Sequence, residues 1–292
     1  MSDRASQVLA QGVPPGVPKS CRGLADHGVV HPDPPPCLTM RLLKREPNGE
    51  LVLTQHNDRN VPLYAILAHT WGEEEVTFQD VEAGTGKSKA GWEKIDFCAA
   101  QAAADGLQYF WVDTCCINKK NAVELAQGMN SMFSWYQRAE KCYVFLSDVS
   151  VVELKTPDES AQDVWEQAFR GSRWFNRGWT LQELLAPKSV EFFSKGRKRL
   201  GDKHSLERQI QQITGITAKA LQGSPLNEFS VDEKIRWAER RDTTKEEDQA
   251  YCLLGMFDIS MPLIYGEGKE NALSRLREEI QKREEGCADI SP

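Results

Sequence analysis

The stretch that decides the fold is Tyr64-Ala-Ile-Leu-Ala-His-Thr-Trp71, a short apolar run that ends at Gly72. A run of this length and composition is typical of a buried β-strand. Tyr109-Phe-Trp-Val-Asp113 predicts a second buried strand, and Cys142-Tyr-Val-Phe-Leu146 predicts a third. The chain is therefore expected to build its core on a sheet.

Segments with helical periodicity separate these strands. Residues 91–104 are rich in alanine with apolar positions at helical spacing, and residues 121–140 repeat that spacing. Strand, helix, strand, helix, strand in this order predicts right-handed crossovers and a parallel sheet covered on both faces. A helix over 179–185 and a core strand over 190–193 extend the pattern. The expected fold class is α/β, with a mostly parallel sheet flanked by helices.

The two ends of the chain differ from this centre. Seven of the 14 prolines fall within the first 37 residues, which contain no aromatic residue, so residues 1–38 are predicted to form a disordered leader. Two short strands are expected on either side of Pro47-Asn48-Gly49. One folded domain is predicted over 39–285, with an α/β core over 39–200 and a helical extension over 201–285.

The extension is predicted to be helical only and to pack as a layer on the sheet. Helical periodicity covers four segments, and Ser230 and Thr244 stand where N-cap residues are expected. The four segments are 206–213, 231–240, 245–257 and 269–282.

Composition excludes several classes of protein. The 292 residues carry a formal net charge of -7, which excludes a generally basic nucleic-acid coat. No apolar run approaches the roughly 18 residues that span a bilayer, and a secretory signal is not recognisable, so a cytoplasmic location is expected. The eight cysteines form no CxxC pair and the five histidines form no HExxH motif, so no metal site is expected.

The strongest local signal is the segment from Arg170 to Arg199. It has eight basic and two acidic residues, a formal charge of +6, which leaves -13 on the remainder. Within it Trp179, Gln182 and Glu183 fall on about one helical turn. A carboxylate among leucines must pair with an arginine or face a cleft. An ion pair between Arg177 and Glu183 that merely orders the helix is the structural alternative to a functional site.

Asp113 is a second candidate, because it follows a predicted parallel strand. Ligands of open parallel sheets bind at the carboxyl ends of the strands. Capping of the loop over 114–118 is an equally good interpretation of Asp113. The neighbouring Cys115-Cys116 pair is interpreted as small apolar residues that fill the top of the sheet.

Several long motifs resemble the fungal heterokaryon incompatibility (HET) domain and occur in the order typical of that family. The resemblance covers about residues 40–280, and one departure is Ala68-His69, where relatives usually have Ser-Tyr. It implies a role in fungal non-self recognition, a form of innate immunity in which the domain triggers regulated cell death. The motifs are Tyr64-Ala-Ile-Leu-Ala-His-Thr-Trp-Gly72, Tyr109-Phe-Trp-Val-Asp-Thr-Cys-Cys-Ile-Asn118, Ser131-Met-Phe-Ser-Trp-Tyr136, Cys142-Tyr-Val-Phe-Leu-Ser-Asp148, Arg173-Trp-Phe-Asn-Arg-Gly-Trp-Thr-Leu-Gln-Glu-Leu-Leu-Ala-Pro187, Glu246-Glu-Asp-Gln-Ala-Tyr-Cys-Leu-Leu-Gly255 and Met261-Pro-Leu-Ile-Tyr-Gly-Glu-Gly268.

HET domains are in turn distantly similar to TIR domains, which implies a TIR- or flavodoxin-like core. In that comparison Trp179-Thr-Leu-Gln-Glu-Leu184 resembles the Trp-Cys-x-x-Glu-Leu segment that carries the glutamate with which TIR domains cleave NAD. The resemblance implies that Glu183 is the catalytic residue and that NAD is the substrate rather than a cofactor.

The cleavage chemistry suggests roles for the other candidates. Cleaving the nicotinamide to ribose bond passes through an oxocarbenium-like transition state, and the leaving pyridinium needs no general acid, so one carboxylate can suffice. Glu183 is expected to stabilise the sugar cation, with Arg177 and neighbouring basic residues on the pyrophosphate. For Trp71 and Trp179 two interpretations stay open, core packing and stacking on nicotinamide or adenine. Asp113 and Gln182 complete the candidate binding residues.

Two function classes stay open. One is an NAD glycohydrolase, and the other is a non-enzymatic module that signals death by assembling through its basic segment. Self-association is expected in the active state, because TIR-type sites are often completed by a neighbouring protomer. An upstream NACHT-type sensor or an incompatibility partner is implied by the family, and no nucleic-acid partner is expected. Many relatives continue into a nucleotide-binding domain and repeats, which leaves a stand-alone effector or a fragment as alternatives.

Overall fold

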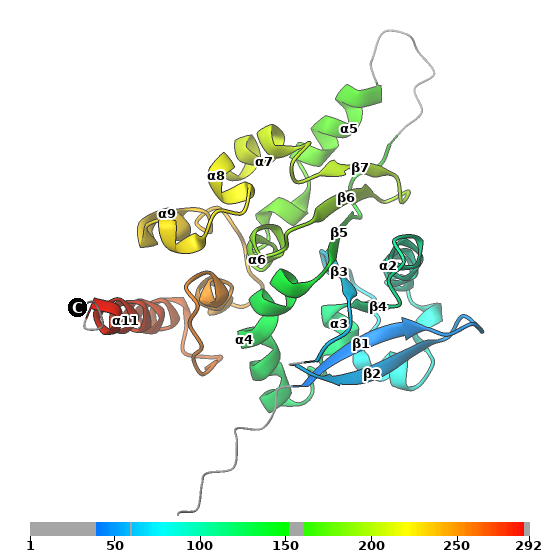
Figure 1. Cartoon of the computed structure of the whole chain (residues 1–292), viewed down its shortest axis with the longest axis horizontal. Coiled ribbons are helices and arrows are strands. Elements are labelled where there is room, and N and C mark those ends of the chain that lie inside the picture. The colour runs from blue at the N-terminus through cyan, green and yellow to red at the C-terminus, as the bar shows by residue number, and fades with distance from the viewer. Residues whose placement is uncertain (1–38, 59, 152–160, 289–292) are drawn as a thin grey trace, which may run out of the picture. The chain divides into compact units, whose positions relative to one another are not determined.

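The computed structural model describes residues 39–58, 60–151 and 161–288. Seven strands form one sheet in the order β2-β1-β4-β3-β5-β6-β7 (Figure 1). The predicted leader over 1–38 lies outside the described residues. The strands are β1 (Thr39–Arg45), β2 (Leu51–Asn57), β3 (Tyr64–His69), β4 (Tyr109–Trp111), β5 (Lys141–Leu146), β6 (Val190–Ser194) and β7 (Arg199–Asp202).

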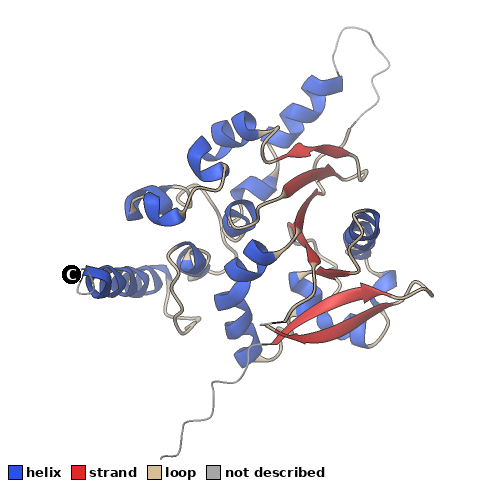
Figure 2. Ribbon diagram, viewed as in Figure 1, coloured by secondary structure: helices blue, strands red, loops and turns tan. Residues whose placement is uncertain are grey.

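Helices occupy most of the remaining described chain (Figure 2). In the first part of the chain they are α1 (Phe78–Glu82), α2 (Trp92–Ala104), α3 (Asp113–Cys116), α4 (Ala122–Arg138), α5 (Ala161–Arg170) and α6 (Thr180–Leu185), with 3₁₀ turns η1 (Gly86–Ser88) and η2 (Arg173–Asn176). In the later part they are α7 (Glu207–Thr214), α8 (Ala218–Leu221), α9 (Val231–Arg236), α10 (Asp248–Tyr251) and α11 (Lys269–Ala288), with η3 (Leu226–Glu228) and η4 (Leu254–Met256).

Four parallel strands form the centre of the sheet, as the alternation of strands and helices predicts. β3 pairs in parallel with β4 on one side and with β5 on the other, and β5 pairs in parallel with β6. All six residues of β3 are buried, which explains its continuous apolar sequence. Antiparallel pairs with β2, β1 and β7 extend both edges, so the whole sheet is mixed.

The strand order places the helices on opposite faces. In chain order the four parallel strands lie as 2-1-3-4, so the direction of the connections reverses next to β3. Helix α2, between β3 and β4, covers one face, whereas α4 and α6 cover the other (Figure 1). An open α/β sheet binds ligands beyond the carboxyl ends of its strands at such a reversal. The carboxyl ends of β3 and of its two neighbours, β4 and β5, are therefore the first place to look for a site.

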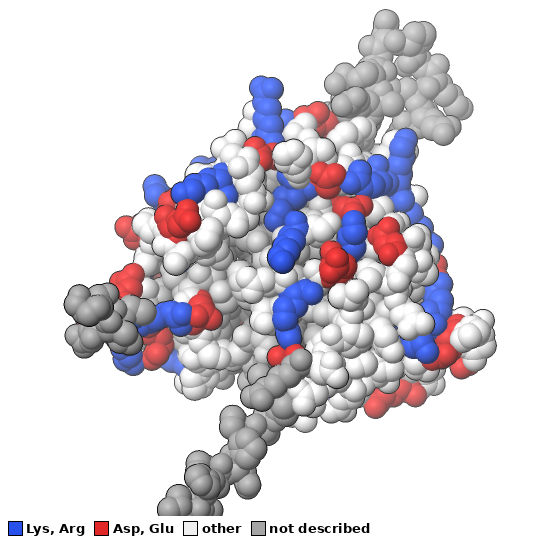
Figure 3. Space-filling view, in the orientation of Figure 1, with Lys and Arg blue, Asp and Glu red and all other residues white. Residues whose placement is uncertain are grey.

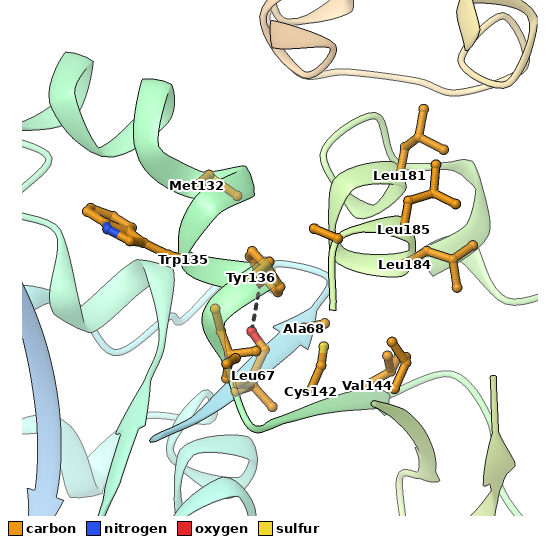
Figure 4. Close-up of a cluster of buried hydrophobic side chains, with 14 of the residues drawn as sticks. Leu67, Ala68, Met132, Trp135, Tyr136, Cys142, Val144, Leu181, Leu184 and Leu185 are labelled. Carbon is orange, nitrogen blue, oxygen red and sulfur yellow. Dashed lines mark hydrogen bonds between the residues drawn. The ribbon is translucent and has the colours of Figure 1, made fainter. Parts of the chain in front are cut away.

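The core between α4, α6 and the sheet is apolar and closely packed. Leu181 and Leu184 of α6 lie against the same part of the sheet as Tyr136 of α4 (Figure 4). Tyr136 is buried, and its hydroxyl donates a hydrogen bond to the carbonyl oxygen of Leu67 in β3 at 3.1 Å. The phenol thereby ties α4 to the central strand.

The helical extension packs mainly on helices rather than on the sheet, which corrects the expectation from sequence. Its α8 contacts α6, its α7 contacts α5 and its η4 contacts α4. The approach of η4 is close, because a Cβ at Gly255 would lie 2.0 Å from that of Phe133. The extension is therefore an outer layer over the helices that cover one face.

Two of the four helical segments of the extension differ from the prediction by being shorter or interrupted, whereas α11 continues to Ala288, beyond the predicted end at 282. Ser230 caps α9 as expected, by accepting a hydrogen bond from the backbone N–H of Glu233. The single helix predicted over 245–257 is instead divided into α10 and η4, and Glu247 rather than Thr244 is the N-cap residue of α10. The break lies at Cys252 and Leu253, just before the residues of η4 that approach Phe133.

A short backbone clasp joins the extension to the start of α6. Arg177 and Asp242 form an isolated parallel bridge, and the Gly178 N–H donates to the Asp242 carbonyl at 2.9 Å. Only glycine fits at 178, since a Cβ there would lie 2.5 Å from the side chain of Thr243. This clasp fixes the N-terminal end of the helix that carries Glu183.

Candidate functional site

Glu183 lies in the first turn of α6, and its side chain is buried. The indole N–H of Trp174 donates to its Oε2 atom at 3.3 Å, and the Tyr136 hydroxyl also hydrogen-bonds the carboxyl group. Both neighbours are neutral. The carboxyl group thus has hydrogen-bonding partners in the core, but none of them carries a charge.

The surroundings of Glu183 favour its protonated form. Burial, and then the negative charge of Asp113, raise the pKa of Glu183 to about 8, against an ordinary value near 4.5. Hydrogen bonds from Tyr136 and Trp174 and the more distant charge of Arg241 act in the opposite direction and offset only part of this rise. When protonated, Glu183 can donate to the Tyr136 oxygen while Tyr136 donates to Leu67.

Asp113 begins α3 directly after β4 and is surrounded by donors. His69 Nε2 lies 3.0 Å from Oδ1, and Trp71 Nε1 and Lys119 Nζ each lie 3.0 Å from Oδ2. Burial alone would raise the pKa of Asp113, but the Lys119 charge and the contacts with His69 hold it well below its usual range. Asp113 is therefore ionised at neutral pH.

The two carboxyl groups form one electrostatic unit at the reversal of the sheet. The Asp113 charge raises the pKa of Glu183, and it also raises that of Tyr136, which lies between the sheet and α6. Active sites often contain two acids whose surroundings drive their pKa values apart, one held neutral and the other ionised. Glu183 and Asp113 match that pattern.

The other three predicted binding residues turn away from Asp113 and contact the helical extension. Trp179 Nε1 donates to Asp248 at 3.1 Å, and Arg177 Nη2 donates to the Thr244 hydroxyl at 3.1 Å. The amide nitrogen of Gln182, which is fully buried, donates to the Cys252 carbonyl at 2.6 Å. The structure therefore brings Trp71, Asp113 and Glu183 into one region, whereas Trp179, Arg177 and Gln182 anchor α6 to the extension.

The ion pair between Arg177 and Glu183 that the sequence left open does not form. Within the described residues no salt bridge joins Glu183 to a basic group, and Arg241, from the extension, is the guanidinium that acts on its charge. Arg241 is buried and donates to the Arg177 carbonyl at 3.0 Å and to the Thr180 hydroxyl at 2.9 Å. Among the described residues, no hydrogen-bond partner is found for its buried Nη2 atom.

Much of the positive charge of residues 170–199 is neutralised locally. Arg170 pairs with Glu166, Arg197 with Asp96, and Arg199 with both Glu191 and Asp202. On the face that Figure 3 shows, basic and acidic side chains are interspersed rather than separated. A formal charge of +6 along the sequence thus does not become a continuous basic surface.

An open cleft of about 1710 Å³ lies at the amino ends of the parallel strands, whereas Asp113 lies at their carboxyl ends. Lys141 and Val190, the first residues of β5 and β6, line it together with Pro187, Lys203 and Phe257 of neighbouring elements. Glu183 does not line this cleft. In this conformation a ligand therefore cannot reach the carboxyl group of Glu183 either directly from solvent or through this cleft.

Sequence reasoning missed the residues that determine how the two acids behave. Tyr136 and Trp174 stand in motifs that were recognised, but their apolar surroundings indicate only core packing. His69 lies near the end of one predicted strand and Asp113 ends the next, so the neighbouring parallel strands could have indicated their contact. Arg241 gives no such signal, because it lies 58 positions after Glu183 in a segment without a distinctive motif.

Fold and site together define an α/β domain with a buried acid at the strand ends and an outer helical layer. None of the helices in the described ranges has the length and apolarity that crossing a bilayer requires. Residues 64–166 match the family described as heterokaryon incompatibility protein (HET). The chain is also similar to "Vegetative incompatibility protein HET-E-1" of Podospora anserina, with 54% identity over 255 residues. The chain is therefore a HET-domain protein.

The relationship covers most of this chain but a small part of that relative. The aligned region includes 86% of the chain and 18% of the Podospora protein. No solved structure gave a significant match, so the TIR- or flavodoxin-like nature of the core stays a prediction.

Proposed function

We propose that this HET domain is an effector of heterokaryon incompatibility that kills by hydrolysing the nicotinamide to ribose bond of NAD. The incompatibility role is supported by the name of the Podospora relative and by the family match. The enzymatic role is supported by one observation above all. Glu183 is buried, has a raised pKa and is electrostatically coupled to the ionised Asp113, which follows the parallel strand β4.

The chemistry assigns different tasks to the two acids. An oxocarbenium-like transition state gains stabilisation from a carboxylate that has little water around it. Glu183 supplies that carboxylate when a cationic substrate enters, because a positive charge nearby lowers the pKa of an acid. Asp113 keeps its charge throughout and attracts the pyridinium end of the substrate. Entry requires α6 and α4 to separate around Glu183, since Trp174 and Tyr136 cover it.

The second candidate is a non-enzymatic module that signals by assembling. It is favoured by the burial of Glu183 and by its absence from the lining of the 1710 Å³ cleft. A glutamate that never meets substrate would serve only to fix α6 against α4. In that case its replacement changes stability but no reaction.

Release of nicotinamide from NAD distinguishes the two functions. Purified protein, both dilute and clustered on a multivalent support, is incubated with NAD, and nicotinamide is measured by chromatography. We expect release from the clustered protein and at least a hundredfold lower rate for Glu183→Gln, which keeps the shape of the side chain. Glu82→Gln on the exposed surface of α1 is the matched control and retains the rate.

One result would contradict the enzymatic function, and another would contradict only the catalytic role of Glu183. Absence of nicotinamide from clustered wild-type protein that is folded refutes the enzymatic function and leaves the assembling module. Equal rates for the wild type and Glu183→Gln refute the role of Glu183 but not the reaction.

A further inference from the structure

Trp71 is a half-exposed aromatic side chain held in a fixed position at the end of β3. Its exposed fraction is 50%, and its indole N–H donates to Asp113 Oδ2 at 3.0 Å. This hydrogen bond orients the ring, so that a large aromatic face is presented at the surface beside a carboxylate. An aromatic face next to a carboxylate is a combination that attracts cations.

The protein places one of its own cations on this ring. Lys119 Nζ lies 3.6 Å from the centroid of Trp71 and 3.0 Å from Asp113 Oδ2. The ammonium group therefore makes a cation–π contact and an ion pair at once, with the same two residues. Its position marks where a positive charge is favourable.

Lys119 is a removable occupant of this position. It belongs to the loop between α3 and α4, and its side chain is 30% exposed. Among the described residues, the Lys119 ammonium group contacts Trp71 and Asp113. A lysine at the surface can rotate into water at small cost, because water hydrates an ammonium well.

His69 distinguishes the carboxylate from an ordinary surface acid. It is buried and contacts Asp113 Oδ1, the oxygen that Lys119 does not use. Asp113 consequently keeps two donors, His69 and Trp71, when Lys119 leaves. The aromatic face and the charge therefore stay in place for another cation.

We propose that Trp71 and Asp113 form a binding site for a planar aromatic cation of the pyridinium type, and that Lys119 occupies this site until such a ligand displaces it. This inference rests on the proposed function, since the nicotinamide ring of NAD is a pyridinium. Exchange of an ammonium for a pyridinium leaves the net charge beside Asp113 unchanged. The planar ligand also stacks on the indole, which an ammonium cannot do.

The chemistry predicts an unusual effect of removing a positive charge. Lys119→Met frees the ring and leaves Asp113 without its strongest charged neighbour. We expect a pyridinium cation to bind about tenfold more tightly to this variant, because it no longer competes with an internal cation. Lys120→Met removes a neighbouring exposed lysine and is the matched control, with unchanged affinity.

The test uses 1-methylnicotinamide, a pyridinium without a glycosidic bond to cleave, and neutral nicotinamide as its uncharged counterpart. Binding is followed by quenching of tryptophan fluorescence, and Trp71→Phe identifies the contribution of Trp71 among the eight tryptophans. We expect 1-methylnicotinamide to quench the fluorescence of the wild type saturably, and this quenching to be lost in Trp71→Phe. The Kd for 1-methylnicotinamide should be lower in Lys119→Met than in the wild type. The quenching by neutral nicotinamide should be the same in the wild type and in both lysine variants.

Several outcomes would overturn the inference. A Kd for the cation that is equal or weaker in Lys119→Met shows that Lys119 does not compete for the site. Equal tightening in Lys120→Met shows a general charge effect, and quenching that survives in Trp71→Phe places the ligand elsewhere. Thermal unfolding of each variant confirms that it is folded before binding is measured.

The binding experiment with 1-methylnicotinamide and the NAD hydrolysis experiment can fail independently of each other. Binding of 1-methylnicotinamide at Trp71 without release of nicotinamide from NAD supports the site and refutes the hydrolysis. Release from NAD together with an unchanged Kd in Lys119→Met supports the hydrolysis and refutes displacement of Lys119.

Discussion

Asp113 and Glu183 are two carboxyl groups in one electrostatic unit, yet their surroundings shift them in opposite directions. Asp113 keeps partial exposure and receives the Lys119 ammonium, His69 and the Trp71 indole. Glu183 is enclosed by the α4 and α6 layer and receives only neutral donors. The pKa of Asp113 falls well below its usual range, whereas that of Glu183 rises to about 8.

The difference shows that the charge of the donors matters as much as burial. Burial acts on both groups in the same direction, since it disfavours any ionised form. At Asp113 a nearby positive charge outweighs that effect, and at Glu183 hydrogen bonds from a phenol and an indole do not. The variants below change one of these contributions at a time.

The largest effect is expected from the titration of Glu183. A carboxyl group whose pKa is raised on folding stabilises the protein fully below the unfolded value near 4.5 and loses that contribution as pH rises through about 8. The free energy of unfolding of the wild type should therefore fall, relative to Glu183→Gln, by on the order of 4 kcal/mol between pH 5 and pH 9. Urea unfolding followed by tryptophan fluorescence measures this difference.

The comparison with Glu183→Gln contains its own control, because all other titrating groups are common to both proteins. A difference that stays constant from pH 5 to pH 9 would show that Glu183 ionises normally. In that case its surroundings do not resemble those of an active-site acid.

An intermediate effect with the opposite pH dependence is expected at Asp113. Asp113→Asn removes the negative charge that Lys119 and His69 contact, and it should lower the free energy of unfolding at pH 7 by about 2 kcal/mol. Because the pKa of Asp113 is depressed, its contribution is present above the ordinary range near pH 4 and is lost on acidification. The gap between the two proteins in urea unfolding should stay nearly constant from pH 7 to about pH 5 and close as the pH falls below 4. A gap that persists unchanged below pH 4 would contradict the assigned shift.

The smallest effect is expected from Tyr136→Phe, which removes one neutral donor from Glu183. Loss of the hydroxyl should lower the free energy of unfolding by about 1 kcal/mol at pH 6, because its bond to Leu67 is lost. The phenol stabilises the carboxylate, so its removal should move the pH-dependent loss of stability to higher pH. Tyr64→Phe, which removes another buried phenol, serves as the control and leaves that midpoint in place.

The central strands of the fold could be predicted from sequence because their signals are local. β5 and β6 begin and end within one residue of the predicted bounds, and β3 begins at the predicted Tyr64 but ends two residues before Trp71. Continuous apolar runs in this composition have few alternatives. α5 was missed although Trp165 and Phe169 stand one helical turn apart in it, and the edge strand β7 was missed because it is short and polar. The helix predicted over 245–257 is divided into α10 and η4, and the close contact of Gly255 with Phe133 is tertiary, so no local pattern encodes it.

The sequence nominated the candidate residues of the site, but most of their contacts could not be predicted from it. Trp71 and Asp113 do meet, as expected from their positions at the ends of neighbouring parallel strands. The partners of Trp179 and Gln182 lie about 70 positions later, and no local pattern encodes such contacts. The direction in which each acid shifts depends on those distant partners, so sequence could nominate Glu183 without predicting its pKa.

The clasp between Gly178 and Asp242 also has a consequence for synthesis of the chain. The Arg177 carbonyl is bound by a residue 64 positions later, so α6 leaves the ribosome well before the group that completes its N-terminal end. Domains fold as units during translation, and contacts of high sequence separation form late. Until Arg241 has emerged from the ribosome, the helix that carries Glu183 therefore lacks the hydrogen bond from Arg241 to the Arg177 carbonyl. A domain of this design stays without its final acid geometry until nearly the whole of it has been made.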